Sequence, residues 1–125
     1  MGSENYGIAV HGGAGVMKNL SENQKQKIEE QIIKTLTEAF KIIEQGGTSM
    51  DAVEFAVSEF EDSPLFNAGR GSVYNSEEVQ EMDASIMTGS DLNAGAVATL
   101  KTIKNHIIFK NFLIYNSFLK TQSRF

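Results

Sequence analysis

The stretch from Asp51 to Asn75, DAVEFAVSEFEDSPLFNAGRGSVYN, combines a helix pattern with a glycine-rich turn. Pro64, the one proline of the sequence, ends the helical pattern. Beyond it, Gly69 and Gly71 permit a compact backbone that can curl its own carbonyl oxygens inward, an arrangement that a hard cation accepts. Asn67 in the same turn carries an amide that can orient a catalytic hydroxyl. The stretch therefore predicts a helix followed by a turn that holds a candidate site.

Two helices are expected around this turn. Ser21 and Gln24 have the spacing of a capping box, and the apolar residues after them recur every three or four positions, which indicates a long amphipathic helix. The Gly46-Gly47 pair ends that helix. A second helix starts near Thr48 or Ser49, with Asp51 in its first turn. The apolar positions are Ile28, Ile32, Leu36, Phe40 and Ile43 in the first helix, and Val53, Ala56, Val57 and Phe60 on one face of the second.

Three strands complete the expected order of strand, helix, helix, strand, strand, which places the chain in the α/β class. Residues Tyr6–Val10 form a short β-prone run that enters a glycine-rich loop. Residues 82–87 and 92–100 alternate small or apolar with polar side chains, and the TGSD link between them is typical of a turn, so we expect a hairpin there. The last segment, residues 105–125, fits a helix or strands equally well.

The composition is that of one ordinary folded domain. The chain has 125 residues, of which 41% are hydrophobic and 22% are charged, close to the averages of globular proteins. A net charge of -5 without a dense Lys/Arg run argues against a nucleic-acid partner. The sequence has no cysteine, which fits a reducing compartment, and no window is apolar enough for a membrane span. We therefore expect a cytoplasmic location without a membrane partner.

The loop His11–Gly15 first suggests a phosphate cradle. Its spacing does not fit a Walker loop, because no Gly-Lys-Ser/Thr occurs, and it does not fit a dinucleotide fingerprint, because the third glycine is missing. His11 can act as a general base or as a hydrogen-bonded structural residue, and the second role is commoner for a single histidine at a strand end. His106 has no partner at metal-ligand spacing and is expected to be incidental.

Seven carboxylates cluster in the sequence, and a pair of them can in principle support glycosidase chemistry or bind calcium. No Asp-x-Asp-x-Asp-Gly loop is present, so most of them are expected to be solvated surface groups. Asp83 is the expected exception, because it lies among small and apolar residues of a strand, where a carboxylate needs a hydrogen-bond partner. The cluster comprises Glu59, Glu61, Asp62, Glu77, Glu78, Glu81 and Asp83.

Three blocks of sequence together resemble the isoaspartyl peptidase/L-asparaginase family, the plant-type or type 2 asparaginases. They are AVHGGAG after the first expected strand, the Asp51–Asn75 stretch, and MDASIMTGSDLNAGAVATLKTIKN in the expected hairpin. The blocks occur in the order that the family shows, and the likeness is to its N-terminal, α-subunit part. We therefore expect an asparaginase-like portion at residues 1–105 and a divergent tail at residues 106–125.

This resemblance implies an N-terminal nucleophile hydrolase folded as a four-layer αββα sandwich. In that family a precursor cleaves itself, and the freed N-terminal threonine of the β subunit attacks the substrate amide with its own α-amino group as base. The substrates are L-asparagine and β-aspartyl (isoaspartyl) dipeptides. The family resemblance implies no cofactor apart from a structural sodium ion, and it implies homo-oligomers of α/β units.

The resemblance also assigns residues of this sequence. His11, Gly12 and Gly13 match the family's HGG loop, which lies beside the nucleophile, and Asn67 matches the asparagine close to that threonine. Thr88 stands where an aspartate is more usual. The family's sodium loop, which acts through backbone carbonyls, matches Phe60, Glu61, Ser63, Phe66, Ala68 and Arg70.

The largest departure from the family is the missing catalytic block. None of the threonines at positions 35, 37, 48, 88, 99, 102 and 121 has the Gly-Thr-Val-Gly-like context of the family's nucleophile. The resemblance therefore implies a truncated α-subunit portion that lacks its β subunit and is inactive alone. Two alternatives stay open: a glycosylasparaginase-like relative, which the missing cysteines and signal peptide disfavour, and a non-enzymatic protein that binds a β-like partner.

Overall fold

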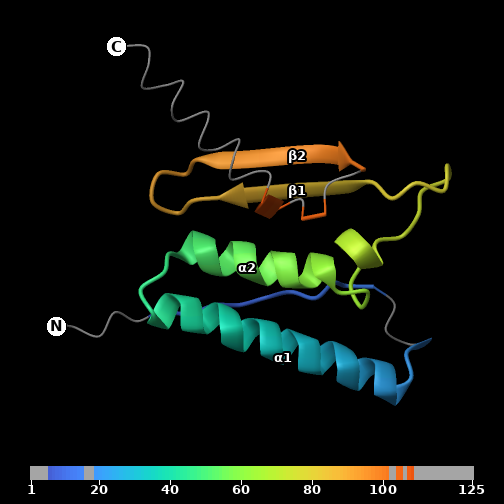
Figure 1. The fold of residues 1–125 in the computed structure, drawn as a ribbon, viewed down its shortest axis with the longest axis horizontal. Coiled ribbons are helices and arrows are strands. Elements are labelled where there is room, and N and C mark those ends of the chain that lie inside the picture. The colour runs from blue at the N-terminus through green and yellow to red at the C-terminus, as the bar shows by residue number, and fades with distance from the viewer. Residues whose placement is uncertain (1–5, 16–18, 102–103, 106, 109–125) are drawn as a thin grey trace, which may run out of the picture.

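Helices α1 (Glu22–Glu44) and α2 (Ser49–Asp62) lie side by side, and a hairpin of strands β1 (Met82–Met87) and β2 (Ala94–Leu100) lies beyond α2 (Figure 1). This is a computed structural model, and it describes residues 6–15, 19–101, 104–105 and 107–108. The expected α/β class is confirmed for this part of the chain. Neither helix within it is both long and apolar enough to cross a membrane.

Both helices begin where the sequence predicts, because each has a capping box. The Ser21 hydroxyl accepts a hydrogen bond from the Gln24 N–H at 3.3 Å, and the Gln24 side chain accepts one from the Ser21 N–H at 2.9 Å. In α2 the Thr48 hydroxyl accepts from the Asp51 N–H at 3.1 Å, and the Asp51 carboxylate accepts from the Thr48 N–H at 2.8 Å. These bonds satisfy N–H groups that an uncapped helix start leaves without a partner.

The end of α1 also follows the prediction. Gly46 has a φ of +87°, which a glycine adopts without strain, and its N–H donates to the Ile43 carbonyl at 3.0 Å. The next N–H, of Gly47, donates to the Ile42 carbonyl at 2.9 Å. The two glycines therefore end the helix and turn the chain into α2.

Three alanines form the centre of the core. Ala39 of α1 and Ala52 and Ala56 of α2 are buried against one another, and their small side chains allow the two helices to approach closely. The predicted apolar face of α2 is wrong at Val53, because this side chain is 42% exposed. The buried stripe runs every four residues from Ala52 to Phe60, and Val53 lies about 100° further round the helix.

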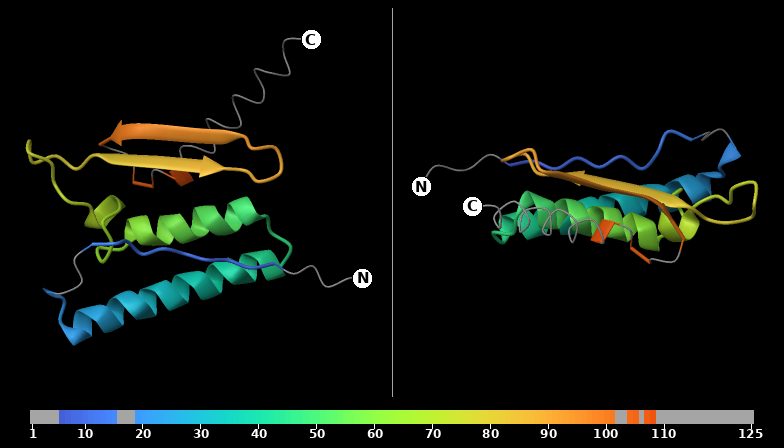
Figure 2. Two further views of the ribbon diagram at one scale, coloured as in Figure 1. Left: turned by 180° about the vertical axis from the view of Figure 1, so that it is seen from behind. Right: turned by 90° about the horizontal axis from the view of Figure 1, so that it is seen from above.

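The expected strand at Tyr6–Val10 is not observed. This segment is extended and runs lengthwise along the helical pair (Figure 2). Ile8 and Val10 pack against the alanine core there, and the centroids of the Tyr6 and Phe40 rings are 5.5 Å apart. A strand requires a neighbouring strand for its hydrogen bonds, and in the described part of the chain the two hairpin strands pair with each other.

The predicted hairpin is confirmed, with a later start of its second strand. Leu92 has a φ of +58° in the turn, so β2 begins at Ala94, and the Thr88 N–H donates to the Asn93 carbonyl at 2.9 Å to close the turn. The register pairs Met82 with Leu100 but Ala84 with Val97, so two residues of β2 face one residue of β1. That mismatch is a β-bulge.

Candidate functional site

The turn after α2 places the Glu61 carbonyl oxygen close to Gly69 and the Pro64 and Phe66 carbonyl oxygens close to Gly71, and we call residues 60–71 the carbonyl turn. It includes the 3-10 helix η2 (Gly69–Gly71). The Phe60 carbonyl accepts the Ser63 N–H at 3.2 Å, and the Ala68 carbonyl accepts the Gly71 N–H at 3.1 Å. Of the six residues matched to a sodium loop, Phe60, Glu61, Ser63 and Phe66 are buried, Ala68 is half-buried and Arg70 is exposed.

Two glycines decide how tight this turn is. Gly69 has a φ of +49°, and a Cβ on it would overlap the Glu61 carbonyl oxygen. A Cβ on Gly71 would overlap the Phe66 carbonyl oxygen and would lie 3.0 Å from the Pro64 carbonyl oxygen. Only glycine at these positions allows the carbonyl oxygens to come so near the opposite side of the turn.

The donors of the carbonyl turn fit a hard cation such as sodium, because peptide carbonyl oxygens are the ligands that such ions accept. Within the described residues, no three His, Cys, Asp or Glu side chains are grouped in a way that could hold a metal ion. A cation in this turn would meet main-chain oxygens, since these are the donors that Gly69 and Gly71 allow to come close. The residues that would supply them are those matched above: Phe60, Glu61, Ser63, Phe66, Ala68 and Arg70.

Asn67 lies on the outer side of the carbonyl turn and is exposed. Its side-chain carbonyl oxygen accepts a hydrogen bond from the Val73 N–H at 3.0 Å. This bond ties the turn to the segment that leaves it and fixes the amide plane. The NH₂ group is then the donor with which Asn67 can orient a hydroxyl, and that role stays a prediction.

The HGG segment, residues His11–Gly13, makes a small local turn. The His11 Nδ1 atom accepts a hydrogen bond from the Gly13 N–H at 3.3 Å, and Gly13 has a φ of +114°. His11 therefore has the hydrogen bond expected of a structural histidine. In the neutral ring this bond leaves the proton on Nε2, which makes Nε2 a donor rather than a base.

The HGG segment and the carbonyl turn meet at Gly12. A Cβ on Gly12 would lie 3.0 Å from the Ile32 Cδ1 atom and 3.2 Å from the Phe66 Cε1 atom, so the backbone there runs between α1 and the turn. The sequence links the two segments to one site only through the family resemblance. The contact between the Phe66 ring and Gly12 has no local sequence signal, because it joins residues more than fifty positions apart.

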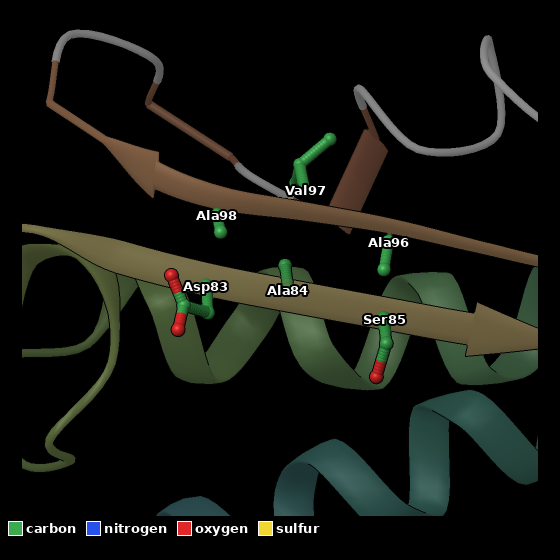
Figure 3. A pocket seen from close by; sticks show the side chains of 6 residues that line it. All are labelled: Asp83, Ala84, Ser85, Ala96, Val97 and Ala98. Atoms are coloured by element: carbon green, nitrogen blue, oxygen red, sulfur yellow. The ribbon is translucent and has the colours of Figure 1, made fainter.

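A shallow cavity of about 350 Å³ lies along the hairpin. Its lining comes from both strands (Figure 3) and comprises Asp83, Ala84, Ser85, Ala96, Val97 and Ala98. The Asp83 carboxylate accepts a hydrogen bond from the Thr99 N–H at 2.8 Å, so the predicted partner of Asp83 is the unpaired backbone at the bulge. Thr99 itself has a φ of +55°, which a β-branched residue rarely adopts. Asp83 is nevertheless exposed.

The other carboxylates of the cluster are mostly exposed, as predicted, with Glu61 as a clear correction because it is buried within the carbonyl turn. Glu81 pairs with Lys101 at 2.9 Å, and hydrogen bonding and the positive charge of that lysine lower the pKa of the Glu81 carboxyl.

Thr88 donates its hydroxyl hydrogen to the Asp91 carboxylate, which lowers the pKa of Asp91. Thr88 thus has a local role in the hairpin turn. His106 and residues 109–125 lie outside the described residues.

Comparison with known proteins identifies the class of this chain. The family described as asparaginase matches residues 4–116, and the chain belongs to this family of hydrolases. It is 47% identical over 100 residues to the isoaspartyl peptidase/L-asparaginase of Bos taurus and 48% identical over 100 residues to that of Mus musculus. A putative isoaspartyl peptidase/L-asparaginase of Dictyostelium discoideum is 45% identical over 103 residues.

These relatives are much longer than the part that matches. The alignments cover 80% of this chain with the bovine and mouse proteins and 81% with the Dictyostelium protein. They cover 32%, 30% and 30% of the respective relatives. The chain therefore spans about a third of the length of the curated relatives that it matches.

Proposed function

We propose that this chain forms the N-terminal part of an isoaspartyl peptidase/L-asparaginase hydrolase. The observation that carries the proposal is the family match over residues 4–116 together with identities of 44–48% to the mammalian relatives. The reaction is hydrolysis of the side-chain amide of L-asparagine or of the isopeptide bond of a β-aspartyl dipeptide. An N-terminal threonine in a second, β segment is the nucleophile, with its α-amino group as base.

The residues of this chain support that nucleophile and do not react. The carbonyl turn holds a sodium ion through main-chain oxygens, which fixes the end of α2 and the backbone of Asn67. The Asn67 NH₂ group donates to the threonine hydroxyl or to the oxygen that develops negative charge. His11–Gly13 line the same site from the opposite side. The contact between Gly12 and Phe66 supports a common location for these groups.

The proposed architecture is a four-layer αββα sandwich completed by the β segment. Helices α1 and α2 supply one outer layer, and β1 and β2 supply part of one inner sheet. The exposed side chains of the hairpin are mostly small and can lie against a second sheet. They are Asp83, Ser85 and Met87 on β1 and Ala94, Ala96 and Ala98 on β2.

An activity assay with and without a β segment tests this proposal. The 125-residue chain is purified alone and together with a co-expressed segment of the mouse relative that comprises everything after the 100 matched residues, including its β part. Aspartate release from a β-aspartyl dipeptide is then measured. We expect no turnover by the chain alone and measurable turnover by the complex. The control is the same complex with the nucleophilic threonine of the β subunit changed to alanine, which should be inactive.

Two results would contradict the proposal: robust turnover by the chain alone, or a stable complex without turnover. The second result would favour a non-enzymatic role in binding a β-like partner, for which the exposed hairpin surface is the supporting observation. Turnover of a glycosylated asparagine in preference to the dipeptide would favour the glycosylasparaginase-like alternative instead. The same purified complex therefore distinguishes all three.

A further inference from the structure

Phe66 contributes to two different parts of the candidate site. Its carbonyl oxygen lies inside the carbonyl turn, against Gly71, and its ring packs on the Phe60 ring with 4.4 Å between centroids. The ring also reaches Gly12, where its Cε1 atom would lie 3.2 Å from a Cβ on that glycine. Phe66 is 5% exposed, so the ring is enclosed by these contacts.

We propose that Phe66 is a positioning residue that couples a cation in the carbonyl turn to the conformation of the HGG segment. This inference rests on the cation site of the proposed function. A cation that draws in the Phe66 carbonyl fixes the backbone of Phe66 and hence the direction of its Cα–Cβ bond. In a close-packed interior the ring then transmits the change to its neighbours.

Gly12 is the residue that receives this contact, because it has no side chain to absorb a shift. The Phe66 Cε1 atom and the Ile32 Cδ1 atom both lie close to the position that a Cβ of Gly12 would occupy, so both side chains pack against this glycine. The hydrogen bond from the Gly13 N–H to the His11 Nδ1 atom spans Gly12. A displacement of Gly12 therefore changes the geometry that orients the His11 ring.

Sodium titration followed by ¹H–¹⁵N NMR tests the coupling in the full 125-residue chain. Sodium chloride replaces choline chloride at constant ionic strength, and the amide signals of Gly12, Gly13, Gly69 and Gly71 are followed. We expect all four to shift with one common sodium dependence. Gly89, in the hairpin turn, should not respond.

The variant Phe66→Leu separates the two functions of the residue, because it keeps the carbonyl but loses the reach of the ring. We expect Gly69 and Gly71 still to titrate, and Gly12 and Gly13 to stop responding. Phe55→Leu is the matched control, since Phe55 is a half-buried phenylalanine that packs on the alanine core, and it should leave all four responses intact. A sodium response of Gly12 that persists in Phe66→Leu would overturn the proposal.

A reciprocal experiment covers the case in which Phe66→Leu does not fold. Coupling between two sites must act in both directions. Gly12→Ala, whose Cβ presses on the Phe66 ring, should weaken the sodium affinity read at Gly69 and Gly71 about five-fold or more. Gly15→Ala is its control, because a Cβ there meets open space. An unchanged affinity in Gly12→Ala would contradict the coupling.

The outcomes also distinguish this inference from the proposed function. If Gly69 and Gly71 respond to neither sodium nor potassium in the wild-type chain, the coupling is refuted. The hydrolase proposal is then still judged by dipeptide turnover of the complex. If the complex shows no turnover although the glycine amides respond to sodium, the hydrolase proposal is refuted and the coupling stays in place.

Discussion

The helical half of the molecule, residues 6–15 and 19–71, and the hairpin, residues 82–100, are held in different ways. In the helical half both helices have side-chain caps, they meet through buried alanines, and the turn after α2 is shaped by glycines. In the hairpin, Ile86 is the one buried residue of the two strands. A two-stranded hairpin is only marginally stable in water.

This difference shows which part of the chain is stabilised by contacts among its own elements. The alanine core and the carbonyl turn bury residues from several elements, so the helical half should unfold as one unit. The hairpin relies on pairing between its own strands and presents exposed small side chains. It should open at a lower free energy than the helices, and added strands should stabilise it.

The largest loss of stability is expected from a substitution in the carbonyl turn. Gly71→Ala places a Cβ onto the Phe66 carbonyl oxygen, so we expect the free energy of unfolding to fall by about 3 kcal/mol. Urea unfolding followed by circular dichroism measures this loss. Gly89→Ala is the control in the hairpin, because a Cβ there meets nothing within 4 Å. Similar losses in both variants would contradict the account of the turn.

The next effect is expected in the alanine core. Ala52 is fully buried, and Ala52→Leu must push α1 and α2 apart, which should cost about 2 kcal/mol of the free energy of unfolding. The same urea experiment measures it. Val53→Leu, one residue further at a 42% exposed position, should cost less than about 0.5 kcal/mol. If the two variants unfold alike, the buried face of α2 is wrongly assigned.

A smaller effect is expected at the start of α2. Thr48→Ala removes the hydroxyl that accepts the Asp51 N–H, and we expect a loss of about 1 kcal/mol. Thermal unfolding by calorimetry can resolve such a change. Ser49→Ala leaves both bonds of the capping box in place and serves as the control. An unaltered melting temperature for Thr48→Ala would show that the cap does not stabilise the helical half.

In the hairpin we expect a substitution that increases stability instead of lowering it. Thr99→Gly removes a β-branched residue from a φ of +55°, and relief of that strain should stabilise the hairpin by about 0.5–1 kcal/mol. Hydrogen exchange of the β1 and β2 amides should become slower. Ala98→Gly, at the neighbouring exposed position, should make exchange faster. Faster exchange in Thr99→Gly would mean that the bulge is not strained.

The smallest effect is a pH dependence of the helical half. Hydrogen bonds from the Thr48 side chain and backbone lower the pKa of the Asp51 carboxyl. The folded pKa lies below the unfolded value, so Asp51 stabilises the fold above about pH 4, and this contribution is lost as the pH falls through the lowered pKa. Asp51→Asn should flatten the acid side of a stability profile measured between about pH 2 and 6. An identical profile in both proteins would contradict the cap's electrostatic role.

The sequence predicts the helical half well because its signals are local. The capping box at Ser21, the glycine pair after Glu44 and the proline after α2 each act within a few residues, and the structure has the helix boundaries where they indicate. The hairpin turn is also a local signal, although Leu92 belongs to the turn rather than to β2.

The features that the sequence does not predict correctly depend on contacts between residues that are distant in the chain. Whether Tyr6–Val10 is a strand depends on a neighbouring strand, which its own β-propensity cannot reveal. The choice between Ala52 and Val53 for the buried face depends on how closely α1 approaches. The contact of Gly12 with Phe66 joins two segments that the sequence links only through a family resemblance.

Hydrogen exchange of the hairpin with and without a β segment tests the central claim most directly. The claim is that the helical half is self-sufficient, whereas the hairpin is completed by strands of a β segment of the same hydrolase family. On addition of the remaining part of the mouse relative, amides of Met82–Met87 and Ala94–Leu100 should exchange at least about tenfold more slowly, with little change in α1. Unchanged exchange in the hairpin of a stable complex would contradict the account.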